Sequence, residues 1–512
     1  MVKARVFLLI SQRRFISKLG CMYQVLSVTA GVPALSDEEP VPEDVRGLSG
    51  AQYKDRVVSC LFRARWPGAV SVGMCQTLRD LDLGERHLSV AVSRVLRHLH
   101  KNAKLHDLPA LTYQLLLLAG RGCKEAALEG VIQVFNRLDA EAADREDAAA
   151  GAAGGIPIRP ISSGGLGANS TEELRFVEGT ILLHFNFAMK QDHSLASCVL
   201  KGFQRRAAAA EVGRAFTPFR LALLLSLSRI QRFQQPVLDL VEEIVSDCLV
   251  DGEDGVDGGG GGGRSSSSAK AVERVLLTVV AFSRGWDHLV DSLLRLGLRL
   301  LDRGGGGAAG VSSSPGAVGA SRGMLEKLQG AQSHRAALRA SYLGRVVLME
   351  TFKTHEVVRD QVLSAVLEQV TARSQGVLGY VKLLGLLVQR YPNLLLGKAA
   401  AVQDVFGYIS VLPPTVAERF LQAVSPLMRL RPGLQDSVVL PLRKALFSRE
   451  ERARLVAVGG LVLLLKDQSR NAGGGGGGGG GGSALSLAEG FGLLRRCLTQ
   501  QMVVRAQLYD GL

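Results

Sequence analysis

The histidines and one lysine-containing glycine motif are the groups in this sequence that most resemble metal-binding or catalytic side chains. His98 and His100 stand two residues apart, so they face different sides of a helix, and no H-E-x-x-H pattern accompanies them. Lys398, in "LGKAA", resembles the end of a phosphate-binding loop, but Pro392 stands where the first glycine belongs and Ala399 where serine or threonine would bind magnesium. These patterns predict neither a metal site nor a phosphate loop.

Two further groups resemble catalytic side chains in residue type alone. His184 lies in the apolar helical segment "ILLHFNF", which favours a hydrogen-bonded core histidine over a general base. Glu242 and Glu243 are adjacent, so on a helix they point apart and cannot share one site. We therefore expect no enzyme and no cofactor.

Basic side chains are more suggestive of a function. The segment "PLRKALFSREERARLVAVGG" places five cations on the polar side of two neighbouring helices: Arg443, Lys444, Arg449, Arg452 and Arg454. Such a cluster could neutralise DNA phosphates in a salt-sensitive manner that does not depend on base sequence. Glu450 and Glu451 lie inside the cluster, so ion pairing on a solvated helix face is an alternative.

A single lysine interrupts an apolar helix in "GGLVLLLKDQSRN". Seven residues, Gly459–Leu465, carry no polar side chain, and Lys466 follows on the same periodicity above Val462 and Leu463. We expect Lys466 at the rim of a buried helix flank. One role open to it is to interact with the helix dipole and extend its stem over Leu463, which would contribute about 0.3–1 kcal/mol.

Helices must position these groups, because the composition disfavours strands. The 512 residues are 47% hydrophobic and only 5% aromatic, and no segment sustains strand alternation. Thr217 and Pro218 form a helix start, Pro236 is expected to open the next helix, and Pro426 and Pro441 are expected at turns. Repeated helix–turn–helix units without a fixed consensus predict an all-α fold, an α-solenoid of degenerate antiparallel helix pairs.

Glycine-rich tracts separate the helical blocks. They contain too little apolar surface to offset the entropy of ordering, so we expect disordered loops there. The tracts are Ala148–Gly167, Asp251–Ser268, Arg303–Gly319 and Asn471–Ser483.

The net charge indicates a class of partner, and the cysteine spacing indicates a cellular compartment. The formal net charge of +14 suits an acidic partner such as nucleic acid. Seven scattered cysteines without a C-x-x-C pair indicate a reducing compartment and no structural zinc. No apolar run is long enough to span a membrane.

The first 24 residues are basic, lack acidic side chains and are similar to a mitochondrial transit peptide. An organellar protein is therefore one alternative, and an incorrectly assigned start of the chain is the other.

Six long segments, in the same order, resemble the Fanconi anaemia complementation group I family: "ELRFVEGTILLHFNFAMKQD", "TPFRLALLLSLSRIQRFQQPVLDL", "WDHLVDSLLRLGLRLLD", "METFKTHEVVRDQVLSAVLEQVTARS", "LRKALFSREERARLVAVGGLVLLLK" and "LRRCLTQQMVVRAQLYDGL". The resemblance covers residues 48–512 and implies an internal fragment of a longer protein. It implies these parts: 1–45, an unmatched basic N-terminus; 46–210, the C-terminal part of solenoid 1 with a disordered loop at about 145–170; 213–305, helical domain 1 with a loop at about 251–268; 320–470, solenoid 2; 471–483, a glycine-rich linker; and 484–512, the start of helical domain 2.

The resemblance also implies a function. Members of the family are non-enzymatic nuclear scaffolds of DNA interstrand crosslink repair that form a heterodimer with the group D2 paralogue and clamp DNA, which implies double-stranded or branched DNA as a partner. A RING-type E3 ligase of the Fanconi core complex attaches one ubiquitin to a lysine, and the matching position here is Lys466. Checkpoint kinases modify Ser/Thr-Gln sites after that lysine in the family, whereas here Thr499, followed by Gln500, is the nearby possible phosphosite. A generic α-solenoid adaptor that binds proteins and not DNA is the alternative.

Overall fold

A computed structural model describes most of the chain. The described residues are 52, 55, 56, 59, 62, 68–80, 84–101, 103–151, 171–208, 216–250, 265–283, 286–306, 320–372, 376–472 and 487–511. Every regular element among them is a helix, so the predicted all-α class is confirmed. The basic N-terminal segment and the expected linker at 473–483 lie outside the described residues.

The chain divides into two compact units. Unit 1 comprises residues 1–244 and 274–289, and unit 2 comprises 245–273 and 290–512. The helices of unit 1 are α4 (Gly68–Asp80), α5 (Glu85–Lys101), the 3-10 turn η2 (Leu105–Asp107), α6 (Leu108–Ala119), α7 (Lys124–Gly151), α8 (Thr171–Gln191), α9 (His193–Ala208) and α11 (Pro218–Leu227). The division passes through α12 (Gln231–Val250), α13 (Ser265–Phe282) and α14 (Asp287–Gly306).

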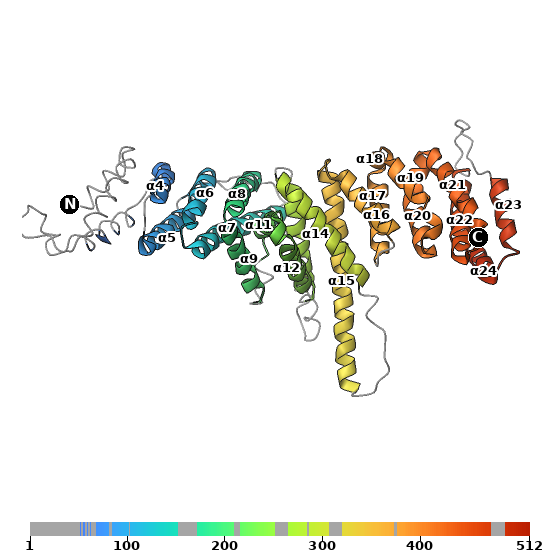
Figure 1. The fold of residues 1–512 in the computed structure, drawn as a ribbon, viewed down its shortest axis with the longest axis horizontal. Helices are drawn as coiled ribbons and strands as arrows, with labels where there is room; N and C mark the ends of the chain where they lie inside the picture. The colour runs from blue at the N-terminus through green and yellow to red at the C-terminus, as the bar shows by residue number, and fades with distance from the viewer. Residues whose placement is uncertain are drawn as a thin grey trace, which may run out of the picture. The chain divides into compact units, whose positions relative to one another are not determined.

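Unit 2 continues with a series of helix pairs (Figure 1). Its helices are α15 (Ala320–Thr354), α16 (Arg359–Thr371), α17 (Val377–Arg390), α18 (Pro392–Leu396), α19 (Ala399–Phe406), the 3-10 turn η4 (Ile409–Val411), α20 (Pro414–Leu430), α21 (Pro432–Leu446), α22 (Glu451–Ala472), α23 (Leu487–Cys497) and α24 (Met502–Gly511).

Each unit has the two-layer packing of a solenoid. In unit 2, α17, α20, α22 and α24 pack side by side in one layer, while α16, α19 and α21 form the other. In unit 1, α4, α6 and α8 form one layer, and α5, α7 and α9 form the second. Where the structure describes the connection, as between α6 and α7 or between α21 and α22, a short turn joins the two layers, and each pair buries its apolar sides against the next pair.

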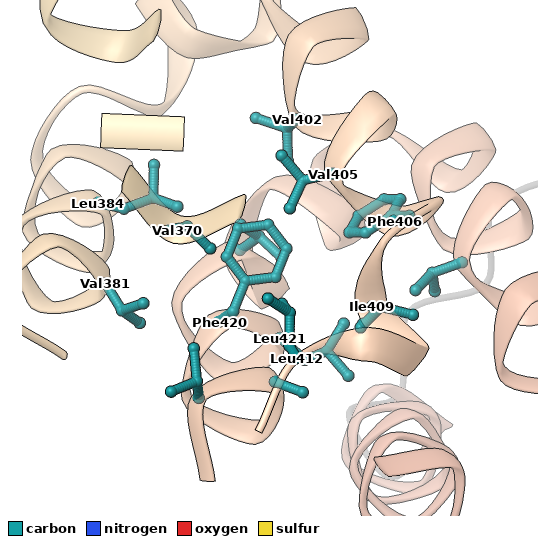
Figure 2. Close-up of a cluster of buried hydrophobic side chains, with 14 of the residues drawn as sticks. Val370, Val381, Leu384, Val402, Val405, Phe406, Ile409, Leu412, Phe420 and Leu421 are labelled. Carbon is teal, nitrogen blue, oxygen red and sulfur yellow. The ribbon is translucent and has the colours of Figure 1, made fainter. Parts of the chain in front are cut away.

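A continuous apolar core holds the pairs of unit 2 together. Val370, Leu384, Val405 and Phe420 come from four different helices and converge in this core (Figure 2). The rings of Phe420 and Phe406 meet edge to face with their centroids 6.1 Å apart, which is a favourable aromatic geometry. The core lies between the layers, which leaves polar side chains for the turns and outer faces.

Helices α14 and α15 approach each other through glycine. A Cβ atom added at Gly344 would lie 2.6 Å from the backbone nitrogen of Leu301 and 2.7 Å from the carbonyl oxygen of Gly297. Both contacts are with backbone atoms, so a side-chain rotation cannot relieve them. The close crossing of α14 and α15 therefore requires glycine at position 344.

Unit 1 contains a buried ionic network instead of a purely apolar core. One guanidinium nitrogen of Arg175 donates to Asp139 and to both carboxyl oxygens of Glu178, at 2.9 and 2.7 Å for the latter. All three side chains are buried, and Glu178 is fully buried. Asp139 also accepts a hydrogen bond from the backbone nitrogen of Phe219 at 3.3 Å, so the network links α7, α8 and the start of α11.

The helix starts and glycine breaks follow the sequence pattern, but three prolines do not. Thr217 accepts a hydrogen bond from the backbone nitrogen of Arg220 and caps α11, as predicted. Pro236 was expected to open a helix and lies inside α12 instead, while Pro426 and Pro441 were expected at turns and lie inside α20 and α21. Each of these prolines is followed by a buried residue, Val237, Leu427 or Leu442, so packing of the helix outweighs the lost backbone hydrogen bond.

The expected loops are also shorter than the composition predicts. Helix α7 runs through Gly151, α13 begins at Ser265 and α14 extends to Gly306, so the edges of three glycine- or alanine-rich tracts are helical. Alanine is the strongest helix former, and a helix already nucleated by packing extends into such residues at little cost.

We expect Gly344→Ala to lower the free energy of unfolding by about 1–3 kcal/mol, because the added methyl group has no space between two backbones. Gly202→Ala in α9 is the matched control, since a Cβ there meets nothing within 4 Å. Alanine at position 202 should stabilise by about 0.5–1 kcal/mol through its helix propensity. Thermal unfolding followed by circular dichroism measures both. Equal effects of the two substitutions would contradict the close approach.

The buried network predicts a pH dependence of stability. Burial, and then the neighbouring Asp139 carboxyl, raise the pKa of Glu178 from 4.5 to about 8 against the opposing effect of Arg175. Since the folded state binds this proton more tightly, the contribution is full below about pH 4.5 and is lost as the pH rises through about 8. Glu178→Gln should therefore reduce the fall in melting temperature between pH 5 and pH 8, as measured by calorimetry. The exposed Glu172→Gln on the same helix should leave the pH profile unchanged.

Candidate functional site

Lys466 lies in α22 and is exposed. Val462, one turn earlier, is buried and Leu463 is half-buried, so the apolar flank exists, but the lysine itself extends beyond it. Helix α22 continues to Ala472, which places Lys466 before the last turn. The dipole interaction considered for Lys466 is therefore weakened, because it falls off within the final turn.

The residue after Lys466 fixes this part of α22 against α20. Asp467 accepts a hydrogen bond from Ser425, and its other carboxyl oxygen lies 2.5 Å from a guanidinium nitrogen of Arg429. The Asp467 side chain is only 14% exposed, so the ion pair is less screened than a surface pair. These contacts set the rotation of α22 and hold Lys466 facing solvent.

Helix α23 packs against the other side of the same turn. A Cβ atom at Gly490 would lie 2.5 Å from a methyl group of Leu465, which shows how closely α23 approaches α22. Lys466 thus extends from a turn held by α20 and α23. An exposed amine on a rigid support is suited to acylation by a bulky partner, since the helix does not have to rearrange.

The structure divides the predicted basic cluster into two groups. Arg443 is tied to Glu489 of α23, with 2.6 Å between a guanidinium nitrogen and a carboxyl oxygen. Arg454 donates to the carbonyl oxygens of Ser448 and Arg449 and, at 2.8 Å, to the side chain of Gln501. These two arginines connect α21 and α22 to the α23–α24 pair, so their first role is structural.

The other three cations of the cluster face solvent. The side chains of Lys444, Arg449 and Arg452 are exposed and form no ion pair or hydrogen bond with any residue that the structure describes. Arg495 and Arg496 of α23 are also exposed. Ion pairing with Glu450 and Glu451, the alternative left open by the sequence, is not present among the described contacts.

An exposed aromatic ring lies in the same turn, and the charge pattern did not reveal it. Phe447, between α21 and α22, is 61% exposed, and the guanidinium of Arg496 lies over its ring, 5.9 Å from the centroid. The sequence feature that could have indicated this ring is a phenylalanine flanked by cations in "RKALFSRE". Arg229 and Arg232 are exposed too, but they belong to unit 1 and are not grouped with this cluster.

Thr499 is accessible. It lies in the turn between α23 and α24, and its hydroxyl donates to the carbonyl oxygen of Arg496 at 3.0 Å. The side chain is exposed, so a kinase could reach it after breaking one hydrogen bond. Phosphorylation of Thr499 remains a prediction.

The histidines occupy structural positions. The Nε2 atom of His98 lies 3.0 Å from the hydroxyl of buried Ser71, a pair that sequence spacing did not reveal, and burial lowers the pKa of His98. His184 packs its ring 4.9 Å from that of Tyr113, and burial lowers its pKa. Within the described residues no group of His, Cys, Asp and Glu could hold a metal ion. No described helix combines the length and apolarity needed to cross a membrane.

Comparison with known proteins gives one consistent family. Models described as FANCI solenoid 1, FANCI helical domain 1 and FANCI solenoid 2 match residues 11–190, 195–254 and 289–462. The first match begins inside the basic N-terminal segment that the resemblance had left unassigned.

Two curated relatives cover nearly the whole chain. The Fanconi anemia group I protein homolog of Mus musculus is 31% identical over 483 residues, and the Fanconi anemia group I protein of Gallus gallus is 30% identical over 489 residues. Each alignment covers 91% of this chain and 34% of the relative, so the chain spans about a third of the length of the curated relatives it matches. A crystal structure of a Kap121p mutant aligns over 100% of this chain and 49% of its own, at 10% identity, but its TM-score of 0.27 is too low to support any conclusion.

Proposed function

Because the chain belongs to the Fanconi anaemia group I family, we propose that it is a non-enzymatic scaffold of DNA interstrand crosslink repair. In this proposal it acts in the nucleus, forms a heterodimer with the group D2 paralogue and binds DNA. A RING-type E3 ligase of the Fanconi core complex attaches one ubiquitin to Lys466. The two-layer solenoid suits a scaffold, because each helix pair adds surface without enclosing an active site.

The observation that carries DNA binding is the set of exposed, unpaired cations at the α21–α22 turn. Lys444, Arg449 and Arg452 are available to phosphates, and two more arginines extend the surface onto α23. Five cations against the two carboxylates of Glu450 and Glu451 leave a net positive surface. Phosphate contacts of this kind supply affinity that does not depend on base sequence and falls with salt. A protein-binding adaptor remains the second candidate, since exposed apolar side chains accompany the cations.

The observation that supports Lys466 as the acceptor is its presentation. The side chain is exposed, while Asp467 beside it is bound to Arg429 and Ser425, so the amine is accessible on a fixed backbone. The resemblance carries the identification of this lysine, and the geometry is compatible with it. Nothing in the local packing has to open before a ligase-bound ubiquitin reaches the amine.

Replacing the three unpaired cations should weaken DNA binding and reduce its dependence on salt. Each lost phosphate contact removes about 0.9 from the slope of log affinity against log salt for duplex DNA. The variant Lys444→Ala, Arg449→Ala, Arg452→Ala should therefore lose up to about 3 from that slope, as measured by fluorescence anisotropy with a labelled duplex.

The control variant for this experiment removes the same number of positive charges as the cluster variant. It replaces three acid-paired cations, Arg205, Arg295 and Lys398, which lie 3.1, 3.0 and 2.8 Å from their carboxylate partners. The control should change the slope much less than the cluster variant. An equal slope for both variants would show that net charge alone acts, and no duplex binding at low salt would favour the adaptor.

Lys466→Arg should abolish single ubiquitination in a reconstituted reaction with the ligase, the group D2 paralogue and DNA. Arginine keeps the charge but cannot be acylated under these conditions, so folding and charge are preserved. Lys444→Arg is the matched control, because Lys444 is an exposed lysine outside the proposed acceptor position. Mass spectrometry identifies the modified residue, and persistent single modification of the Lys466→Arg variant would refute the assignment.

A further inference from the structure

Phe447 is an unusual residue in the basic surface. It follows the last residue of α21 as the C-cap, and 61% of its area is exposed in the turn before α22. A phenyl ring with this exposure contributes little to folding, because burial of apolar area is what stabilises. Its position therefore calls for an explanation other than core packing.

Cations lie close to the ring in the sequence, and one lies over it in the structure. Lys444 precedes it by one helical turn, Arg449 follows two residues later, and Arg496 of α23 lies over the ring at 5.9 Å. The acidic groups of the same turn are Glu450 and Glu451, both exposed. Glu489, the acidic residue of α23 facing this region, is bound to Arg443.

Three other phenylalanines of the described chain lack this combination. Arg232 and Arg359 also lie near phenylalanine rings, but the rings of Phe233 and Phe352 are buried. Phe176 on α8 is 78% exposed, but its exposed neighbours Glu172 and Glu173 are acidic. Phe447 combines an exposed ring with cations that lack acidic partners.

This combination matches a known mode of nucleic-acid recognition. Sites for single strands join basic side chains, which contact the phosphates, with aromatic rings on which bases stack. In a continuous duplex the base faces are covered by their neighbours, so an exposed ring gains nothing there. Only an unpaired base, as in a single strand or at the unpaired arm of a fork, presents a free face.

We propose that Phe447 stacks on an unpaired DNA base and gives this turn a preference for DNA with single-stranded segments over continuous duplex. The proposal rests on the proposed DNA-binding function and adds the residue that contacts an unpaired base. Lys444, Arg449 and Arg452 contact phosphates of either structure, and Phe447 discriminates between them.

The test compares three labelled probes: a single-stranded oligonucleotide, the duplex of the same sequence, and a forked duplex with two unpaired arms. Fluorescence anisotropy measures the affinity of the chain for each probe at one low salt concentration. Phe447→Leu keeps an apolar side chain without an aromatic face, and Phe447→Trp keeps the face. Phe176→Leu in unit 1 is the matched control, since it removes a ring that is at least as exposed as Phe447 and has acidic neighbours.

We expect Phe447→Leu to weaken binding of the single strand and the fork about tenfold, the loss typical of one stacked base, and to change duplex binding less than twofold. Phe447→Trp should restore the single-strand affinity, and Phe176→Leu should change none of the three. Circular dichroism melting curves should agree for all variants, because the replaced rings are exposed.

Three outcomes would overturn the inference. Equal weakening on single strand and duplex would make Phe447 a general contact, and no change on any probe would remove it from the DNA surface. Loss of binding to the group D2 paralogue with unchanged DNA affinities would assign the ring to a protein interface. The failure of the proposed function is distinguishable, because in that case the unsubstituted chain binds none of the probes.

Discussion

The burial of one helix pair against the next is the constraint on which the rest of this structure depends. A pair such as α19 and α20 cannot cover its own apolar surface, so Phe420, Val405 and Leu384 converge only when successive pairs stack. Stacking occupies the sides of each helix that face other helices. The turns and the outer helix faces are left for polar side chains, and the groups with a functional role lie there.

Polar contacts then determine which of the exposed groups are available. Arg443 and Arg454 lie in the same basic segment as Arg449, but they are bound to Glu489 and Gln501 and join successive pairs. Asp467 in turn is bound to Arg429, and this ion pair orients the turn that carries Lys466. The same chemistry, a guanidinium next to an oxygen acceptor, thus supports the fold at some positions and leaves neighbouring cations available for a ligand.

The buried network of Arg175, Asp139 and Glu178 shows the cost of polar groups inside a solenoid. A carboxyl group without solvent is stable in its charged form only with a cation, and one arginine here serves two carboxyls. Burial, together with the second carboxyl beside it, favours the protonated form of Glu178, so its pKa is raised. Arg175 and Glu178 in "ELRFVEG" and Asp139 in "NRLDAEA" are ordinary surface types, so their burial was not visible in the sequence.

The sequence by itself determined the helical class, the pairing of helices and the cap at Thr217, because these depend on local periodicity and on residues with a fixed backbone preference. It also identified the family, from segments long enough to be specific. Only the tertiary structure decided that α20 and α21 continue through Pro426 and Pro441, that Lys466 lies outside the buried flank, and which cations have partners. Those outcomes depend on contacts between residues far apart in the chain, such as Arg443 with Glu489, and a local pattern carries no information about which distant side chain occupies the neighbouring space.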